Sequence, residues 1–290
     1  MDRRNFLKTA AFAGTTVAGL KELRAEDLQE KKEFVGVLVD TTRCIGCRSC
    51  EIACSEAHNL EVPEVKNDSA LEKVRNTSEK QWTVVNRFET KKGEVFVKRQ
   101  CMHCWQPACT SACLTNAMYK TKDGPVIWRE GKCMGCRFCM VSCPFEIPKF
   151  EYHTWNPKIQ KCNMCWERLE RGQKPACVGA CPSDALMFGM KREIMEVARH
   201  RVYNHPGKYV HKIYGEQEVG GTGWLYLSAV PFEQIGFRTD LGITPYPEYT
   251  KEFLFSVPLV LFGVPALLLG LNLLTERKNE VNKSERWENE

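Results

Sequence analysis

The sequence lacks a strong net charge, a catalytic motif and more than one long apolar segment. Its 41 lysines and arginines stand against 36 acidic residues, and the net charge of +5 is spread along the chain. Nucleic-acid binding, which needs a clustered basic face, is therefore excluded. A single long apolar segment excludes a multispanning transporter. There is also no GxxxxGK[ST], no GxGxxG after a strand and no HExxH, so no catalytic residues are predicted.

Cysteine is the residue in excess. All 16 cysteines lie between Cys44 and Cys181, where they make up about one residue in nine, a density that indicates bound metal or a disulfide scaffold. They fall into four groups of four. In chain order the groups are Cys44, Cys47, Cys50 and Cys54; Cys101, Cys104, Cys109 and Cys113; Cys133, Cys136, Cys139 and Cys143; and Cys162, Cys165, Cys177 and Cys181.

The spacing within the groups is typical of iron–sulfur proteins. The first and third groups read C-x2-C-x2-C-x3-C, which is the spacing of bacterial ferredoxins. The second group lengthens one gap by two residues, and the fourth lengthens it further. Three closely spaced thiolates can wrap three irons of a cubane while the tight loop directs backbone N–H groups at its sulfides. The sequence therefore predicts four [4Fe-4S] clusters.

Two other interpretations of the cysteines are weaker. Disulfides suit exported proteins, but cysteines separated by only two residues are poor partners for each other. Zinc ribbons also use C-x2-C pairs, and the fourth group alone resembles one. Three ligands within seven residues, however, crowd a single tetrahedral ion. A zinc-stapled binding module remains the alternative from a different functional class.

The order of the groups predicts which cysteines share a cluster. In two-cluster ferredoxins the last cysteine of one group binds the other cluster, so groups two and three, which are close in sequence, should form one half. Groups one and four should form the other half, with the first half inserted between them. The predicted ligand sets are Cys44, Cys47, Cys50 and Cys181 for cluster 1; Cys54, Cys162, Cys165 and Cys177 for cluster 2; Cys101, Cys104, Cys109 and Cys143 for cluster 3; and Cys113, Cys133, Cys136 and Cys139 for cluster 4.

The two ends of the chain predict its location. Residues 1–25 contain DRRNFLK and then a mildly apolar stretch, as in a twin-arginine export signal, although a basic amphipathic N-terminus is the alternative. Residues 253–274 carry no charge and reach roughly 33 Å as a helix, enough to span a bilayer. A buried core helix is the alternative there.

More lysine and arginine follows this segment than precedes it. The positive-inside rule therefore puts the tail at 275–290 in the cytoplasm and the cysteines on the periplasmic side.

The fold class predicted from these patterns is α+β. Two bacterial-ferredoxin-like halves would occupy residues 26–190, with the second half inserted at about 95–150, followed by a connecting segment at 191–250 and the membrane helix. Strands are expected at 95–98 and 125–128, short helical turns at 112–118 and 180–186, and an amphipathic helix at 192–203. The glycine- and aromatic-rich residues 214–237 are expected to pack on the cluster domain.

The whole chain resembles the iron–sulfur subunits of membrane-bound respiratory oxidoreductases. The resemblance rests on the four cysteine groups, on CPFEIPK at 143–149 and on PACVGACP at 175–182. The RRNF start, YGEQEVGGT at 214–222 and the C-terminal apolar segment are most similar to the hydrogenase-2 subunit. Formate dehydrogenase-N β subunits share VGGT and the C-terminal segment. Leu114 departs from the family, which commonly has a proline there.

The resemblance implies a non-catalytic electron-transfer subunit. It would link a periplasmic catalytic subunit, a nickel–iron uptake hydrogenase, to an integral membrane partner that reacts with quinone. A molybdenum-containing formate dehydrogenase is the alternative catalytic partner. The last histidine, His211, precedes the apolar segment, so a haem in that segment would have no histidine ligand from this chain.

Two arginines occupy the same slot in groups one and three. Because a cluster gains negative charge on reduction, a cation at Arg48 or Arg137 would raise its reduction potential. A solvated loop arginine without such an effect is the equal alternative.

Overall fold

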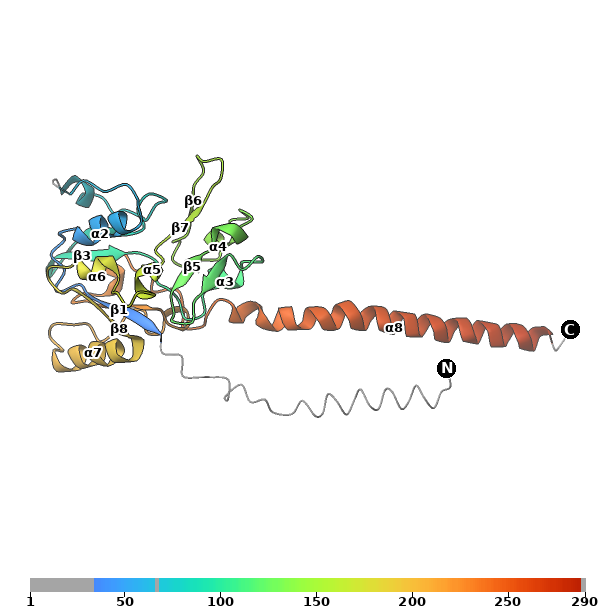
Figure 1. Cartoon of the computed structure of the whole chain (residues 1–290). Coiled ribbons are helices and arrows are strands. Elements are labelled where there is room, and N and C mark those ends of the chain that lie inside the picture. Colours follow the sequence, from blue (N-terminus) through green and yellow to red (C-terminus); the bar gives the residue numbers. More distant parts are fainter. Residues whose placement is uncertain (1–33, 66–67, 288–290) are drawn as a thin grey trace.

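The computed structural model describes residues 34–65 and 68–287. It shows a body of short strands and helices from which one long helix extends (Figure 1). The predicted export signal at residues 1–25 lies outside the described residues.

A three-stranded sheet in the order β8-β1-β9 organises the body. Strand β1 (Val35–Asp40) pairs antiparallel with β8 (Leu186–Met190) and parallel with β9 (Trp224–Leu227). The sequence of β1, VGVLVD, is almost wholly buried on both faces, as expected for a central strand covered on two sides. Residues far apart in sequence are thereby joined in one sheet, and the expected packing of residues 214–237 on the cysteine-rich region is confirmed.

Each face of this sheet packs against a different layer. Alternate side chains of β1 point to opposite faces, so Leu38 contacts α7 (Lys191–Asn204) while Val37 and Val39 face the cysteine loops. Helix α7 buries Ile194 and Ala198 at a spacing of four residues, which is the periodicity of a half-buried helix. The amphipathic helix predicted at 192–203 is confirmed.

Three two-stranded hairpins complete the strands. The predicted strands at 95–98 and 125–128 are confirmed as parts of β3 and β5. The pairs are β2 (Val84–Thr90) with β3 (Gly93–Arg99), β4 (Met118–Lys120) with β5 (Val126–Trp128), and β6 (Lys149–Phe150) with β7 (Ile159–Gln160), all antiparallel.

Apart from α7, the helices of the body are short and begin within the cysteine groups. They are α2 (Ser49–Ala57), α3 (Ala108–Ser111), α4 (Phe138–Val141), α5 (Trp166–Leu169) and α6 (Ala176–Gly179), with single 3-10 turns at Asp68–Leu71, Glu130–Lys132, Glu218–Gly220 and Phe232–Ile235.

The helical turns predicted at 112–118 and 180–186 are wrong, because the helices there come earlier. Helices α3 and α6 start directly after Pro107 and Pro175. The segments that follow contain Asn116 and Asp184 at φ 55° and 49°, a left-handed conformation that ends a right-handed helix.

Helix α8 (Glu248–Trp287) contains the predicted segment 253–274 and continues beyond it. Pro258 and Pro265 lie inside it without ending it. Its residues 248–278 form the one helix in the described chain that is long and apolar enough to cross a membrane, and none of its most apolar stretch is buried. This exposure contradicts the alternative of a buried core helix.

Candidate metal centres

The four cysteine groups share one loop geometry. All 16 cysteines are free thiols. The residue before the second cysteine of each group has a left-handed backbone, which turns the chain sharply enough for successive thiols to point to one side. These residues are Gly46 (φ 71°), His103 (φ 48°), Gly135 (φ 73°) and Met164 (φ 58°).

The similarity is closest between the first and third groups. Arg48 and Arg137 follow the second cysteine, both have φ 60°, and both stand at the start of a helix, α2 or α4. The third residue after the last cysteine is also left-handed in three groups, at Asn116, Glu146 and Asp184. The groups are therefore copies of one structural module, although the spacing in two of them differs.

The modules are arranged in two pairs. Helix α2 of the first group packs on α6 of the fourth, and α3 of the second group packs on α4 of the third. In Figure 1, α2 and α6 lie together on one side of the body and α3 and α4 on the other. The contacts bring together groups one and four, and groups two and three.

The four cysteines predicted for cluster 1 line one small cavity. Its walls include Cys44, Cys47, Cys50 and Cys181. Burial raises the pKa of the Cys44 thiol, the Gly46 N–H opposes this, and the charge of Cys181 raises the pKa further. Mutual repulsion of this kind is expected where thiolates are gathered for a metal.

The cysteines predicted for cluster 2 also lie close together. The pKa of Cys54 is raised to about 12, mainly by burial and next by the negative charge of Cys177. The Ala176 N–H donates to the sulfur of Cys165 over 3.4 Å, and the Met164 N–H donates to that of Cys162 over 3.3 Å. Such N–H donors suit a thiolate ligand, because they stabilise its charge.

The remaining cysteines gather into the two other predicted sets. Burial raises the pKa of Cys104, and the negative charges of Cys143, Cys101 and Cys109 raise it further. The pKa of Cys139 is raised to about 11, mainly by burial and then by the negative charges of Cys113, Cys133 and Cys136. The charges of Cys143 and Cys113 thus act on cysteines of the neighbouring group. Which cysteines share a cluster stays a prediction.

The donor set fits a polynuclear cluster better than a single ion. Within residues 34–65 and 68–287, no three cysteine, histidine, aspartate or glutamate side chains converge closely enough to hold one metal ion. Cys44 and Cys181 instead line the wall of one cavity together with other cysteines. This arrangement suits a cluster in which each iron binds one cysteine sulfur.

His103 gives a second test of fit. It is 1% exposed, and its Nδ1 accepts a hydrogen bond from the Val126 N–H over 2.8 Å, so Nε2 carries the ring proton. In the described chain Nε2 has no acceptor, and leaving a buried donor unpaired costs roughly 1–3 kcal/mol. A cluster sulfide held in the loop of His103 would supply that acceptor.

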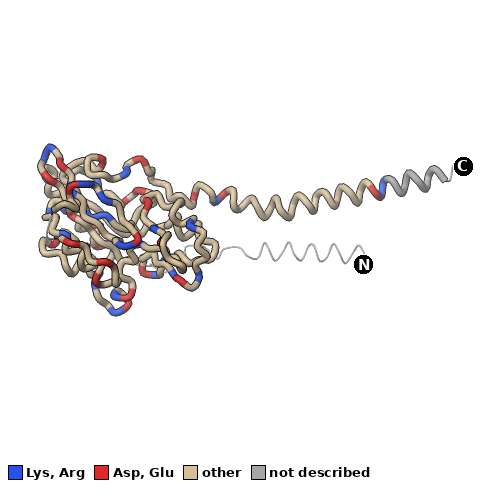
Figure 2. The backbone as a smooth tube through the Cα atoms, turned by 90° about the horizontal axis from the view of Figure 1, so that it is seen from above, with Lys and Arg blue, Asp and Glu red and all other residues tan. Residues whose placement is uncertain are grey.

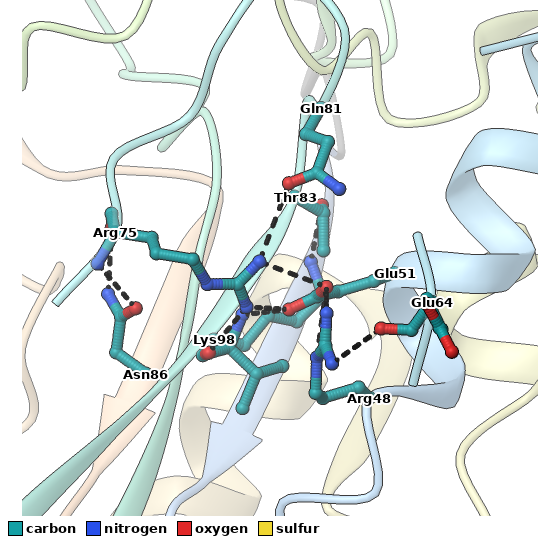
Figure 3. A network of polar contacts seen from close by, with 9 residues as sticks. Arg48, Glu51, Glu64, Arg75, Gln81, Thr83, Asn86 and Lys98 are labelled. Atoms are coloured by element: carbon teal, nitrogen blue, oxygen red, sulfur yellow. Dashed lines mark hydrogen bonds and ion pairs between the residues drawn. The ribbon is translucent and has the colours of Figure 1, made fainter. Parts of the chain in front are cut away.

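The two arginines predicted to tune clusters have different surroundings. Arg48 is 3% exposed, and its guanidinium pairs with the Glu51 carboxylate over 3.0 Å, while Arg75 contacts the same carboxylate (Figure 3). Its positive charge is therefore balanced. Arg137 is exposed and lies 5.4 Å from the Phe150 ring centroid. These surroundings favour the alternative of a structural or solvated arginine.

Sequence reasoning missed several buried charged residues, among them Glu51 and Lys98. Both are at most 2% exposed. Neither lies in a recognisable motif, because Glu51 is one of three residues between two cysteines and Lys98 is one residue of a short strand. Only a count of charges in predicted buried positions would have singled them out.

These loops, their free thiols and their paired packing define a ferredoxin-type iron–sulfur protein. Residues 93–191 match the family model described as a 4Fe-4S dicluster domain. A protein of Nitratidesulfovibrio vulgaris is 45% identical over 99% of this chain and 80% of its own length. The hydrogenase-2 operon protein HybA of Escherichia coli O157:H7 is 32% identical, with 97% of this chain and 96% of HybA covered.

The iron–sulfur subunit of the nitrate-inducible formate dehydrogenase of Escherichia coli K12 is 34% identical over 69% of this chain and 70% of its own length. The chain therefore belongs to the family of ferredoxin-type iron–sulfur subunits of respiratory oxidoreductases, whose role is electron transfer.

Proposed function

We propose that the chain relays electrons through four [4Fe-4S] clusters between a periplasmic nickel–iron uptake hydrogenase and a quinone-reactive integral membrane partner. The observation that supports this most is the gathering of 16 free thiols into four sets arranged in two packed pairs. Each bound cluster would supply a one-electron carrier. The chain's own part is to hold the clusters in series, exclude water from them and dock at both ends.

We propose the ligand sets predicted from the sequence. Cys44, Cys47, Cys50 and Cys181 hold cluster 1, and Cys54, Cys162, Cys165 and Cys177 hold cluster 2. Cys101, Cys104, Cys109 and Cys143 hold cluster 3, and Cys113, Cys133, Cys136 and Cys139 hold cluster 4. The pKa causes described above support this grouping.

The exposure of the cysteines suggests which cluster lies next to which partner. Only Cys47 of cluster 1 and Cys136 of cluster 4 are exposed, so these clusters are the ends of the series. Helix α8 leaves the body on the side of α3 and α4 (Figure 1). Cluster 4 then faces the membrane partner and cluster 1 the catalytic subunit. Four exposed apolar side chains beside cluster 4 suit such docking: Leu114, Met134, Phe138 and Val141.

The charge pattern supports a single-pass anchor with a cytoplasmic C-terminus. In Figure 2 the middle of α8 carries no charged residue, and an acidic and then a basic residue follow this uncharged stretch. Arg277 and Lys278 follow closely after the uncharged stretch, and the positive-inside rule places the side with more lysine and arginine in the cytoplasm. The body is then periplasmic, as the twin-arginine motif in residues 1–25 also suggests.

The hydrogenase is proposed as the partner because HybA matches 97% of this chain at 32% identity. A formate dehydrogenase is the alternative, since an iron–sulfur subunit of the Haemophilus influenzae enzyme matches 95% of this chain at 30% identity. Isolating the tagged chain with its complex from membranes and measuring metals separates the two. Nickel supports the hydrogenase, and molybdenum without nickel would replace it with the formate dehydrogenase.

The cluster content is tested on the anaerobically purified full chain by iron analysis and redox-titrated EPR. We expect about sixteen irons per chain, one for each cysteine, and several interacting reduced-cubane signals. Little iron together with stoichiometric zinc would overturn the proposal in favour of a zinc-stapled module.

The crossed ligand arrangement is tested by a pair of substitutions. Cys143→Ser should alter the EPR signal and potential of the cluster held by Cys101, although Cys143 belongs to the third group. Cys113→Ser should in the same way alter the cluster held by Cys133. If each substitution affects only the cluster of its own group, the crossed assignment is wrong.

A further inference from the structure

Lys98 is a buried lysine among the cysteine loops. It lies on β3 and is 2% exposed. Its Nζ donates to Thr83 Oγ1 over 3.0 Å and to Gln100 Oε1 over 3.1 Å, and lies 4.6 Å from the Trp224 ring centroid (Figure 3 shows Lys98 beside Thr83). The site therefore holds the ammonium group with neutral oxygen acceptors and an aromatic face.

No carboxylate balances this charge. Within the described residues, no aspartate or glutamate oxygen lies within 4.0 Å of Lys98 Nζ. A buried ammonium without a counter-charge is strongly unfavourable. Arg48 shows the contrast, because it is equally buried but pairs with Glu51 over 3.0 Å. The negative charge that balances Lys98 has to come from another kind of group.

The nearest negative groups are the cysteines of two proposed clusters. Lys98 lines the cavity formed by the four cysteines of cluster 1. Burial lowers its pKa, but the charges of Cys177, Cys50 and Cys162 outweigh burial and raise the pKa above its ordinary value. Cys50 belongs to cluster 1, and Cys177 and Cys162 belong to cluster 2. Lys98 therefore lines the cavity of the cluster 1 cysteines, and its charge also acts on cysteines of cluster 2.

We propose that Lys98 is the shared counter-ion of clusters 1 and 2 and holds their reduction potentials above the values they would have without it. This inference rests on the proposed function, since it requires that both cysteine sets carry [4Fe-4S] clusters. Each cluster gains one negative charge on reduction, so a fixed buried cation stabilises the reduced form more than the oxidised form. Lys98 touches no reacting group in this scheme. It acts through the electrostatic potential that it imposes on both clusters.

The experiment is redox-titrated EPR with iron analysis on the full chain, purified anaerobically in detergent. Lys98→Met removes the charge and keeps much of the side-chain volume. At a fixed potential we expect the reduction equilibrium of two of the four clusters to shift at least tenfold toward the oxidised form. For a one-electron couple this is about 59 mV more negative. The other two midpoints should stay unchanged.

Two further variants separate charge from structure. Gln100→Glu keeps Lys98 and the side-chain shape but places a carboxylate next to Nζ, so it should shift the same two midpoints in the same direction. Lys92→Met removes an exposed lysine from the turn between β2 and β3, and it should shift none. A shift of only one midpoint, or of none, in Gln100→Glu would show that a charge at this place does not act on both clusters.

The outcomes of this experiment are distinct. Unchanged midpoints in Lys98→Met with full iron content overturn the inference, and so does an equal shift of all four. If Lys98→Met fails to assemble its clusters, Gln100→Glu is used instead, and unchanged midpoints or an equal shift of all four again overturn the inference. A wild-type chain without four clusters would instead refute the proposed function, and this result is read from the iron analysis before any variant is compared.

Discussion

Glu51 is expected to be the most sensitive charged residue for the stability of the body. It lies on α2 and is 1% exposed. Its carboxylate pairs with Arg48 over 3.0 Å and with Arg75 over 2.5 Å, and it accepts the Val85 N–H over 2.6 Å (Figure 3). One side chain thus joins the cluster-bearing helix to the segment before β2 and to β2 itself.

The substitution Glu51→Gln keeps an oxygen for the Val85 N–H and removes only the charge. Arg48, at 3% exposure, is then left as a buried and uncompensated cation. Removing one partner of a buried ion pair costs about 3–5 kcal/mol. For a domain of about 200 residues each kcal/mol lowers Tm by roughly 2–4 °C, so the apparent Tm should fall by about 6–20 °C.

The assay is anaerobic thermal unfolding of the cluster-loaded chain, followed by far-UV circular dichroism and visible absorption at one scan rate, because unfolding with cluster loss is irreversible. Glu61→Gln is the matched control, since its pair with Lys80 is 72% and 68% exposed and is worth at most about 1 kcal/mol. Equal Tm values for Glu51→Gln and Glu61→Gln would refute the reasoning.

Three further predictions concern the backbone, the cores and docking. Gly215→Ala should lower Tm strongly or prevent folding, since its Cβ would lie 2.2 Å from the Trp224 carbonyl oxygen at φ +92°. Gly131→Ala, whose Cβ meets no atom within 4 Å, is the control, and similar Tm values would contradict the clash. After cluster removal, amide hydrogen exchange should rise first around α3 and α4, because the core beneath them includes cysteines. It should rise last at α7, whose described core contains none. Uniform exchange would contradict this order. Val141→Glu, at an 81% exposed position, should reduce copurification of the membrane partner with iron content unchanged, and full recovery of that partner would exclude docking there.

Much of the local structure followed from the sequence because it depends on neighbouring residues. Cysteine spacing predicted the loops, and the structure shows the same left-handed turn at Gly46 and Gly135. The helical periodicity of α7 and the uncharged stretch of α8 were also readable. The helical turns predicted at 112–118 and 180–186 were wrong, since those helices start earlier, directly after Pro107 and Pro175.

The sequence by itself determined the number, order and type of the cysteine loops, because a thiol's direction depends on the few residues around it. Only the tertiary structure decided which charges lie between the loops and whether they are balanced. Glu51 pairs with Arg48 on its own segment and also with Arg75, 24 residues away, whereas Lys98 meets Trp224 from a strand more than a hundred residues away. Burial and pairing depend on such long-range contacts, and they set the electrostatic surroundings of a redox centre.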